Sequence, residues 1–343
     1  MDNIFLTGAT GFIGSHVAEI LCEKGEKISC LVRKNSNLEH LKTLPINMVY
    51  GDITNPEQLH EVIKQTVTVI HIAGLAKDWG TYEEFYRINV EGTLNVLKAG
   101  YNNKIRHLII TGSISSYGEE DYPGAKDEDS PYNSHYPYFL DRNFPCKMNY
   151  YRDTKALATQ KAIAYAEEHG LNLTVIEPTW VYGEREFHTG FYEYIQTAKS
   201  GIPFFPGSSH NNFHVIYAKD LAEAYYQAYL KKPSGIQRII VGNESPEKME
   251  KIHAIFCRET GIRKPRAIPR WLVYPLAFLL EWLFTIFSSK HPPFLTRGRL
   301  NMFYDNIEYA TSKARQMLLF TSRYTLEEGI HSTVQWYKQQ KLI

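Results

Sequence analysis

Cysteine, net charge and long apolar runs are all scarce in this chain of 343 residues. The four cysteines, Cys22, Cys30, Cys146 and Cys257, form no C-x-x-C pair and lack the spacing of metal ligands. We therefore expect a reducing compartment, without a disulfide scaffold, a zinc site or another metal site. The formal net charge of +1 creates no global field, so we expect no nucleic-acid partner.

The first apolar run begins at Ile4 and leads straight into glycines, without the basic stretch and longer apolar core of a signal peptide. A cytoplasmic protein is therefore expected. One long apolar run does occur, over residues 271–287, with Glu281 as its only charge. It is at the lower limit for a membrane span and contains Pro275, so we do not expect a simple spanning helix.

Basic residues flank the apolar run 271–287, as they would for a helix lying on an anionic membrane surface: Lys264, Arg266, Arg270 and Lys290. Two interpretations stay open at this point. The run can form a substrate-access lid with peripheral membrane contact, or a buried helix pair that covers a small lobe.

The rest of the composition is typical of a folded, water-soluble protein, with 43% hydrophobic and 22% charged residues. The length exceeds that of one compact core, so two packed units, or one large unit with a lobe, are expected. Aromatic residues reach 13% and include 24 tyrosines. Such a content suggests an aromatic-lined cavity, and it also makes tyrosine motifs more frequent by chance.

Short β-branched runs alternate with helical patterns in the first half of the chain. Strands are predicted at 4–7, 27–32, 47–50, 67–71, 107–111 and 173–176, and helices at 11–23, 56–64, 82–98 and 151–168. This alternation predicts an α/β protein with a Rossmann-type, doubly wound parallel sheet. After Pro178 the pattern loosens into a smaller, mixed α/β lobe, with a helix at 220–230 and a returning strand at 238–241.

Two domains follow from this pattern. We predict a nucleotide-binding domain over residues 1–178, with a returning segment near 213–243, and a C-terminal substrate-binding lobe over 179–343. A turn-rich insertion over 119–149 has the length of a lid or a binding loop. Its acidic clusters, 119–121 and 126–129, are interpreted as a solvated face.

A glycine-rich loop joins the first predicted strand to the first predicted helix. Residues 7–14 read T-G-A-T-G-F-I-G, which places glycines at positions 8, 11 and 14. Gly8 permits a tight turn, Gly11 lets backbone N–H groups approach a pyrophosphate, and Gly14 lets the helix pack closely on the sheet. The loop therefore predicts a dinucleotide site that also includes Thr10, Phe12 and Ile13.

The second strand indicates which dinucleotide is bound. It ends at Val32 and is followed by Arg33, without the acidic residue that would bind the ribose 2′-hydroxyl of NAD. Arg33 can stack on adenine and pair with a 2′-phosphate, so NADP(H) is favoured and NAD(H) stays an alternative. Asp52, beside Ile53 after the third strand, is placed to meet the adenine amino group or to serve as a turn residue.

Tyrosine and lysine four residues apart on a helix share one face, where the ammonium lowers the pKa of the phenol and prepares it for proton exchange with a carbonyl or alcohol oxygen. Four pairs have this spacing: Tyr122/Lys126, Tyr151/Lys155, Tyr309/Lys313 and Tyr337/Lys341. The first has proline and glycine between its members, and the last two follow the end of the sheet pattern. Tyr151/Lys155 alone opens a helix between two strands of the sheet.

Ser113 comes just after the strand that ends at Thr111, at the edge of the sheet where ligands of such folds bind. Its hydroxyl can hold a substrate oxygen beside the Tyr151 phenol. Ser115 and Ser116 are competing candidates, and a simple turn serine is the alternative.

Together these residues resemble the extended short-chain dehydrogenase/reductase family, or NAD-dependent epimerase/dehydratase superfamily. The match covers the glycine loop and the following motifs: Gly51-Asp52, His71-Ile72-Ala73-Gly74, Asn89-Val90-Glu91-Gly92-Thr93, 113–118, 151–155 and 177–183. The resemblance implies that Tyr151 is the acid/base, that Ser113 positions the carbonyl and that Lys155 binds the nicotinamide ribose.

The same resemblance implies further roles around the cofactor. Ala73, Gly74 and Pro178 would line the cofactor, and Asn89 would hold the helix of Tyr151, although it can equally be a local capping residue. The family's usual Arg-Pro is Glu177-Pro178 in this chain, which puts the role of residue 177 in doubt. Many relatives form dimers through the helices near Tyr82 and Tyr151, so a homodimer is expected from the resemblance.

Three segments favour a hydrophobic substrate. Residues 76–87 and 292–296 resemble the 3β-hydroxysteroid dehydrogenase-like branch, which includes 2-alkyl-3-oxoalkanoate reductases, and 271–287 is apolar. Residues 211–217 lack the arginine with which nucleotide-sugar enzymes hold the diphosphate. We therefore expect an NAD(P)-dependent oxidoreductase acting on a sterol-like or β-oxo-acyl lipid. A nucleotide-sugar epimerase or dehydratase with tightly bound NAD, and a nucleotide-binding sensor without catalysis, are the alternatives.

Overall fold

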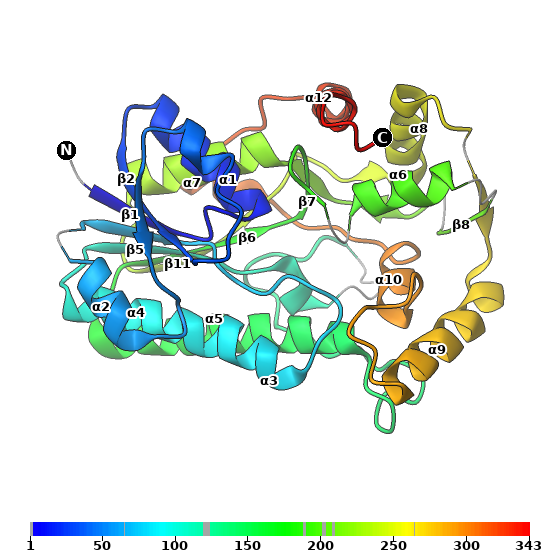
Figure 1. The fold of residues 1–343 in the computed structure, drawn as a ribbon, viewed down its shortest axis with the longest axis horizontal. Helices are drawn as coiled ribbons and strands as arrows, with labels where there is room; N and C mark the ends of the chain where they lie inside the picture. Colours follow the sequence, from blue (N-terminus) through cyan, green and yellow to red (C-terminus); the bar gives the residue numbers. More distant parts are fainter. Residues whose placement is uncertain are drawn as a thin grey trace.

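A seven-stranded parallel sheet forms the centre of the computed structural model (Figure 1). Its strand order is β3-β2-β1-β4-β5-β6-β11. The bounds are β1 (Asn3–Thr7), β2 (Lys27–Val32), β3 (Asn47–Tyr50), β4 (Thr68–His71), β5 (His107–Thr111), β6 (Leu173–Pro178) and β11 (Ile236–Val241). The structure describes residues 3–64, 66–118, 124–187, 190–200, 204–207, 210–263 and 265–343. The predicted doubly wound α/β fold is confirmed.

Successive side chains of each strand point to opposite faces of the sheet. Both faces are apolar, and helices cover both of them. On β1, Ile4 and Leu6 belong to the core beneath α1 (Phe12–Glu23), α7 (Ala218–Lys231) and α11 (Ser312–Leu318). Phe5 belongs to the opposite core. That core lies beneath α2 (Pro56–Val62), α4 (Gly92–Asn102) and α5 (Lys147–His169).

The helix predicted over 82–98 is a composite. It begins as α3 (Tyr82–Phe85), widens into a π-helical turn over Tyr86–Glu91 and continues as α4. π-Helical turns arise where an extra residue is fitted into a helix, and they are frequent at functional sites. This one contains the buried Asn89. The hydrophobic period of the sequence gives no sign of the extra residue.

The chain after β6 forms the predicted smaller lobe. Its strands pair in twos: β7 (Trp180–Tyr182) with β10 (Val215–Tyr217), β9 (Asn212–Phe213) with β12 (Glu247–Lys248), and β8 (Phe204–Pro206) with β13 (Arg266–Ile268). Its helices are α6 (Phe191–Lys199), α8 (Met249–Thr260), α9 (Arg270–Ile286), α10 (Arg297–Met302) and α12 (Leu326–Gln339). Strand β11 returns to the main sheet as predicted, whereas a domain division at residue 178 stays a prediction.

The apolar run 271–287 forms one helix, α9, so the expectation of a buried helix pair is wrong. One side of α9 is buried through Val273, Ala277 and Glu281. The buried Glu281 carboxylate accepts a hydrogen bond from Nε of Arg297 at 2.9 Å, which explains how this charge is accommodated. Among the helices of the ranges given above, none has the length and apolarity to span a bilayer. Lys264, expected to flank the run, lies outside the described residues.

The cluster at 126–129 differs in part from its interpretation as a solvated face. Lys126 is buried and its Nζ donates to the carbonyl oxygens of Tyr117 and Gly118. Glu128 accepts a hydrogen bond from the backbone N–H of Ile240 at 2.8 Å. Lys126 therefore fastens the insertion to the turn that follows β5, and Glu128 fastens it to β11. The acidic residues 119–121, and Tyr122 of the first tyrosine–lysine pair, lie outside the described residues.

Candidate active site

The glycine loop packs so tightly that side chains are excluded at two positions. Gly8 has a φ of +81°, and a Cβ added there would lie 2.5 Å from the backbone nitrogen of Ala73. A Cβ on Gly14 would lie 2.1 Å from the carbonyl oxygen of Gly8. The first turn of α1 is thereby held directly against the end of β1.

The N-terminus of α1 is suited to a phosphate. Gly11 occupies its N-cap position, and among the described residues no side chain caps it and no acidic group lies in its first turn. A helix N-terminus of this kind presents backbone N–H groups and a partial positive charge to an anion. The loop therefore fits the pyrophosphate of a dinucleotide, with Thr10, Phe12 and Ile13 next to it in the chain.

Arg33 and Asp52 lie after β2 and β3, at the same edge of the sheet. Arg33 is exposed. Asp52 accepts hydrogen bonds from the backbone and hydroxyl of Thr54, both at 2.8 Å, so it forms the turn that was one of its two expected roles. Partial burial raises the pKa of Asp52, but these hydrogen bonds and the charges of Arg33 and Arg87 outweigh it and hold the pKa below its ordinary value.

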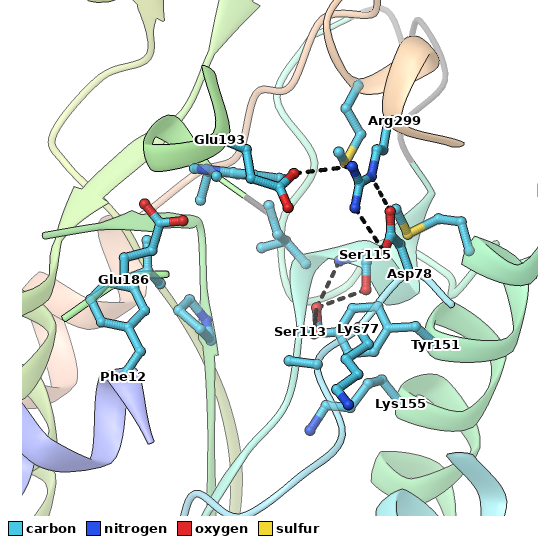
Figure 2. A pocket seen from close by; sticks show the side chains of 18 of the residues that line it. Phe12, Lys77, Asp78, Ser113, Ser115, Tyr151, Lys155, Glu186, Glu193 and Arg299 are labelled. Atoms are coloured by element: carbon cyan, nitrogen blue, oxygen red, sulfur yellow. Dashed lines mark hydrogen bonds and ion pairs between the residues drawn. The ribbon is translucent and has the colours of Figure 1, made fainter. Parts of the chain in front are cut away.

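A cavity of about 560 Å³ runs from the first turn of α1, across the ends of the central strands, to α9 and α10. Figure 2 views it from close by, with Phe12 and Glu186 on one side and Tyr151 and Lys155 on the other. Of the residues predicted to form the site, those that line it are Phe12, Ile13, Gly74, Asn89, Ser113, Tyr151, Lys155 and Pro178. The remaining predicted residues do not line it: Gly8, Thr10, Gly11, Gly14, Arg33, Asp52, Ile53 and Ala73.

The hydroxyl groups of Ser113 and Tyr151 meet where this cavity passes the end of β5. Tyr151 donates to Oγ of Ser113 at 3.4 Å. Ser113 itself caps the short helical turn Ile114–Tyr117, and its Oγ lies 2.7 Å from Oγ of Ser115. The competing candidate Ser116 is fully buried and does not line the cavity, whereas Ser115 does.

Lys155 lies beside this pair, one turn further along α5 (Figure 2). Its Nζ donates to the carbonyl oxygen of Thr111 at 2.5 Å. Burial lowers the pKa of Lys155 to about 8, and the charge of Glu177 opposes this shift. The expectation that Tyr151 opens its helix is wrong, because α5 begins at Lys147 and Tyr151 lies in its second turn.

Asn89 connects three parts of the site. Its Oδ1 accepts from the backbone N–H of Leu75 at 2.7 Å, and its Nδ2 donates to the carbonyl oxygen of Leu75 and to Oγ1 of Thr154. Leu75 follows Gly74 in the loop after β4, and Thr154 precedes Lys155 on α5. The amide thus fixes the cavity-lining loop against the helix of Tyr151.

Charged residues that the sequence did not single out lie in the same cavity. Arg299 of α10 pairs with Asp78, and its Nη1 lies 3.1 Å from Glu193 of α6 (Figure 2). Lys77 and the buried Glu186 also line the cavity, and burial raises the pKa of Glu186 to about 8. Asp78 belongs to the segment 76–87 that resembles the 3β-hydroxysteroid dehydrogenase-like branch. Nothing in the spacing of residues 78, 193 and 299 indicates that they lie together.

Apolar side chains from several elements form the rest of the wall. The set is Leu75, Met148, Trp180, Val181, Tyr194, Ile268, Val273, Leu276, Phe294, Leu295, Met302 and Phe303. Most of them come from the lobe, which therefore supplies an apolar chamber next to Ser113 and Tyr151. Within the described ranges, no three His, Cys, Asp or Glu side chains gather as metal ligands.

Comparison with known proteins places this geometry in a family. The NAD dependent epimerase/dehydratase family model matches residues 4–242. A 2-alkyl-3-oxoalkanoate reductase of Shewanella oneidensis is 24% identical, over 96% of this chain and 85% of the relative. The 3 beta-hydroxysteroid dehydrogenase type 7 of Mus musculus is 27% identical, over 96% of this chain and 94% of the relative.

Solved structures agree on the fold. MoeE5 in complex with UDP-glucose and NAD superposes with a TM-score of 0.76 at 20% identity, over 99% of both chains. The family model and the two relatives also confirm the predicted resemblance to 3β-hydroxysteroid dehydrogenases and 2-alkyl-3-oxoalkanoate reductases. The chain therefore belongs to the NAD dependent epimerase/dehydratase family and is an NAD(P)-dependent short-chain dehydrogenase/reductase that acts on CH–OH or C=O groups.

Proposed function

We propose that this enzyme interconverts a secondary alcohol and a ketone on a sterol-like or β-oxo-acyl lipid, with NADP(H) as the preferred cofactor. One observation carries the proposal: a single cavity holds Ser113, Tyr151 and Lys155 and, apart from a few charged side chains, continues into the lobe between apolar side chains. A hydrophobic ligand whose oxygen lies at Ser113 would bury its carbon skeleton among those side chains.

In this mechanism the bound nicotinamide supplies or accepts the hydride. The Tyr151 hydroxyl gives a proton to the carbonyl oxygen during reduction and takes it back during oxidation. Ser113, 3.4 Å from that hydroxyl, holds the same oxygen by a hydrogen bond. The Lys155 ammonium favours the ionised phenol and binds the nicotinamide ribose. The Thr111 carbonyl and Asn89 keep Lys155 and its helix in place.

The NADP(H) preference rests on Arg33. It is an exposed cation at the end of β2, where family members that use NAD place an acidic residue. The positive charges of Arg33 and Arg87 both act on Asp52 nearby, so this edge of the sheet combines the cations that a 2′-phosphate requires with an acceptor for the adenine amino group.

The substrate class is tested with purified enzyme, by following NADPH consumption with a β-oxo acid of long alkyl chain and with a 3-oxosteroid. In parallel, UDP-glucose is incubated with the enzyme and NAD, and its epimer or dehydration product is sought by chromatography. Turnover with either hydrophobic ketone supports the proposal. Turnover of UDP-glucose alone, or a nucleotide sugar that co-purifies with the protein in mass spectrometry, supports the nucleotide-sugar epimerase or dehydratase instead. The family name covers both activities, but the apolar wall favours the lipid.

We also propose that α9 makes peripheral contact with membranes. Exposed apolar residues follow one stripe of the helix at Leu272, Leu276, Leu279 and Ile286, and Trp271 is 75% exposed. Leu276 also lines the cavity, so the apolar chamber reaches this stripe. A lipid substrate would then enter from the membrane surface without crossing water.

The exposed apolar surface continues beyond α9. Phe139 and Leu140 of the insertion and Phe294 before α10 are exposed, and the ring centroid of Phe139 lies 5.3 Å from that of Phe278 on α9. A homodimer through the helices at Tyr82 and Tyr151 is a separate proposal, drawn from relatives. Its molar mass in solution, measured by light scattering, tests it.

A further inference from the structure

An acidic side chain is fully buried at the end of β6. Glu177 is 0% exposed and precedes Pro178 in the cavity wall. A buried carboxylate without partners would cost several kcal/mol, so its surroundings have to compensate it.

Two hydroxyl donors and one cation, from different segments, surround the Glu177 carboxylate. The hydroxyl of Tyr117 donates to Oε2 at 2.7 Å, and the hydroxyl of Tyr132 donates to Oε1. Arg238, from the neighbouring strand β11, approaches Oε2 with its Nε at 3.5 Å. Its guanidinium also lies over the Tyr132 ring, 4.3 Å from the centroid. Burial raises the pKa of Glu177, and these donors and the Arg238 charge oppose that shift, which favours the ionised carboxylate.

The carboxylate lies next to the backbone that holds Lys155. A Cβ added to Gly112 would be 2.6 Å from Cγ of Glu177 and 3.2 Å from its Oε1, so the side chain passes directly over this glycine. The preceding residue, Thr111, accepts the hydrogen bond from Lys155. The Gly112 N–H donates to the carbonyl oxygen of Ile176, one residue before Glu177. Val175, two residues before Glu177, packs in the core beneath α5, so Glu177 and the Lys155 ammonium lie on the same side of the sheet, beside the same Thr111–Gly112 backbone.

The other titratable groups near this pair do not replace Glu177. His71, on β4, is buried and its pKa is lowered to about 3, so it is neutral. Glu128 is not among the groups that shift the pKa of Lys155; burial and, less strongly, the Glu177 charge raise the pKa of Glu128 itself. Among the described residues, Glu177 is the acid whose charge acts on the pKa of Lys155.

We propose that Glu177 is the positioning residue that keeps the Lys155 ammonium charged, and that it thereby sets the pH range in which the Tyr151/Lys155 pair works. The inference rests on the proposed role of that pair. Glu177 does not touch substrate or cofactor in this role. It acts on Tyr151 through Lys155, as a fixed negative charge beside the Thr111–Gly112 backbone.

The sign of the effect follows from the lysine. Lys155 is charged below its pKa and neutral above it. Removing the negative charge of Glu177 leaves burial unopposed, so Lys155 loses its proton at a lower pH. Without the ammonium, the Tyr151 phenol ionises less readily, and turnover falls at a lower pH on the alkaline side.

The direct test is a pH titration of Lys155 by nuclear magnetic resonance of the whole protein carrying ¹³C at the lysine ε positions. The Lys155 signal is identified as the one lost in Lys155→Arg. In the unaltered protein we expect a midpoint near 8. In Glu177→Gln, which preserves the shape of the side chain, we expect the midpoint about one pH unit lower. Glu177→Asp should recover most of the difference.

Glu128→Gln is the matched control, since it removes a partly buried carboxylate from the same neighbourhood and should leave the Lys155 midpoint unchanged. An unaltered midpoint in Glu177→Gln, or an equal shift in Glu128→Gln, overturns the proposal. If Glu177→Gln does not fold, Tyr132→Phe replaces it: loss of one donor favours the neutral carboxyl, so the Lys155 midpoint should still fall, by less. No fall in that variant also overturns it.

Kinetics give a second readout. With an accepted ketone, the alkaline limb of the kcat/KM profile of Glu177→Gln should move in the same direction as the Lys155 midpoint. The magnetic-resonance arm needs neither substrate nor turnover. A wrong substrate class therefore leaves the Lys155 titration intact, whereas a wrong role for Glu177 shows in the titration itself.

Discussion

Single residues decide the chemistry of this site, and position selects them better than pattern. Several tyrosine–lysine pairs share the i, i+4 spacing, yet Tyr151/Lys155 is the pair that lies in the cavity with Ser113. The location could be predicted because the carboxyl ends of parallel strands always meet at one edge of the sheet. The surroundings of Glu177 could not be predicted, because Tyr117, Tyr132 and Arg238 reach it from distant segments.

Replacing Tyr151 by phenylalanine removes the hydroxyl and keeps the ring. We expect NADPH affinity, measured by fluorescence titration, to stay within about twofold, and kcat to fall by at least about 100-fold because the proton donor is gone. Tyr150→Phe is the control, since this neighbour on α5 does not line the cavity. A Tyr151→Phe enzyme with unreduced turnover would remove the basis of the mechanism.

Reversing the charge of Arg33 tests the cofactor preference. In Arg33→Asp, the carboxylate repels a 2′-phosphate and accepts from a 2′-hydroxyl, so the ratio of kcat/KM for NADPH over NADH should fall by at least about tenfold. Lys34→Asp changes the adjacent exposed cation and should alter the ratio much less. If both variants keep the ratio of the unaltered enzyme, Arg33 does not distinguish the 2′-phosphate of NADPH from the 2′-hydroxyl of NADH.

At the scale of elements, the strands of the sheet followed their β-branched runs closely, and β2, β3 and β5 have the predicted bounds. Helix limits were harder to predict. α5 begins before Tyr151, with Cys146 as its N-cap residue in an extended backbone conformation. The N–H of Cys146 donates to Asp141 of the insertion, a contact outside the helix that the helical pattern does not show. α9 is apolar on both sides, so its hydrophobic period could not tell the buried side from the exposed one.

The exposed side of α9 carries a prediction about membranes. Trp271→Glu combined with Leu279→Glu places two charges on the apolar stripe and should reduce co-sedimentation with phosphatidylserine vesicles at least about tenfold. Leu319→Glu places one such charge at a residue that is 68% exposed outside α9, and binding should persist. Equal binding by all three proteins would mean that α9 does not contact the bilayer, and loss in Leu319→Glu would indicate a nonspecific charge effect.

On the scale of the whole molecule, the cavity joins the sheet to the lobe. Asp78 follows β4, Glu193 belongs to α6 and Arg299 to α10, and the three charges meet in one wall of the cavity (Figure 2). The glycine loop, Ser113, Tyr151 and Lys155 could be predicted as parts of the site because each belongs to a local motif. Arg299 could not be predicted, because Asp78 and Glu193 are separated from it by more than a hundred residues along the chain.

A cofactor bound at the glycine loop should stabilise the whole molecule, because it binds the folded protein and not the unfolded chain. NADPH at about 100 times its Kd should raise the free energy of unfolding by about 2.7 kcal/mol, seen as a higher Tm in a thermal scan. In Gly14→Ala, the added Cβ would lie 2.1 Å from the Gly8 carbonyl oxygen, so the NADPH affinity should fall. At the same NADPH concentration, most of the rise in the free energy of unfolding should then be lost. NADH at the concentration used for NADPH should give a smaller rise, since it lacks the phosphate that Arg33 binds. A rise of equal size with both cofactors would contradict the proposed preference, and a Gly14→Ala protein stabilised as strongly as the unaltered chain would place the dinucleotide away from this loop.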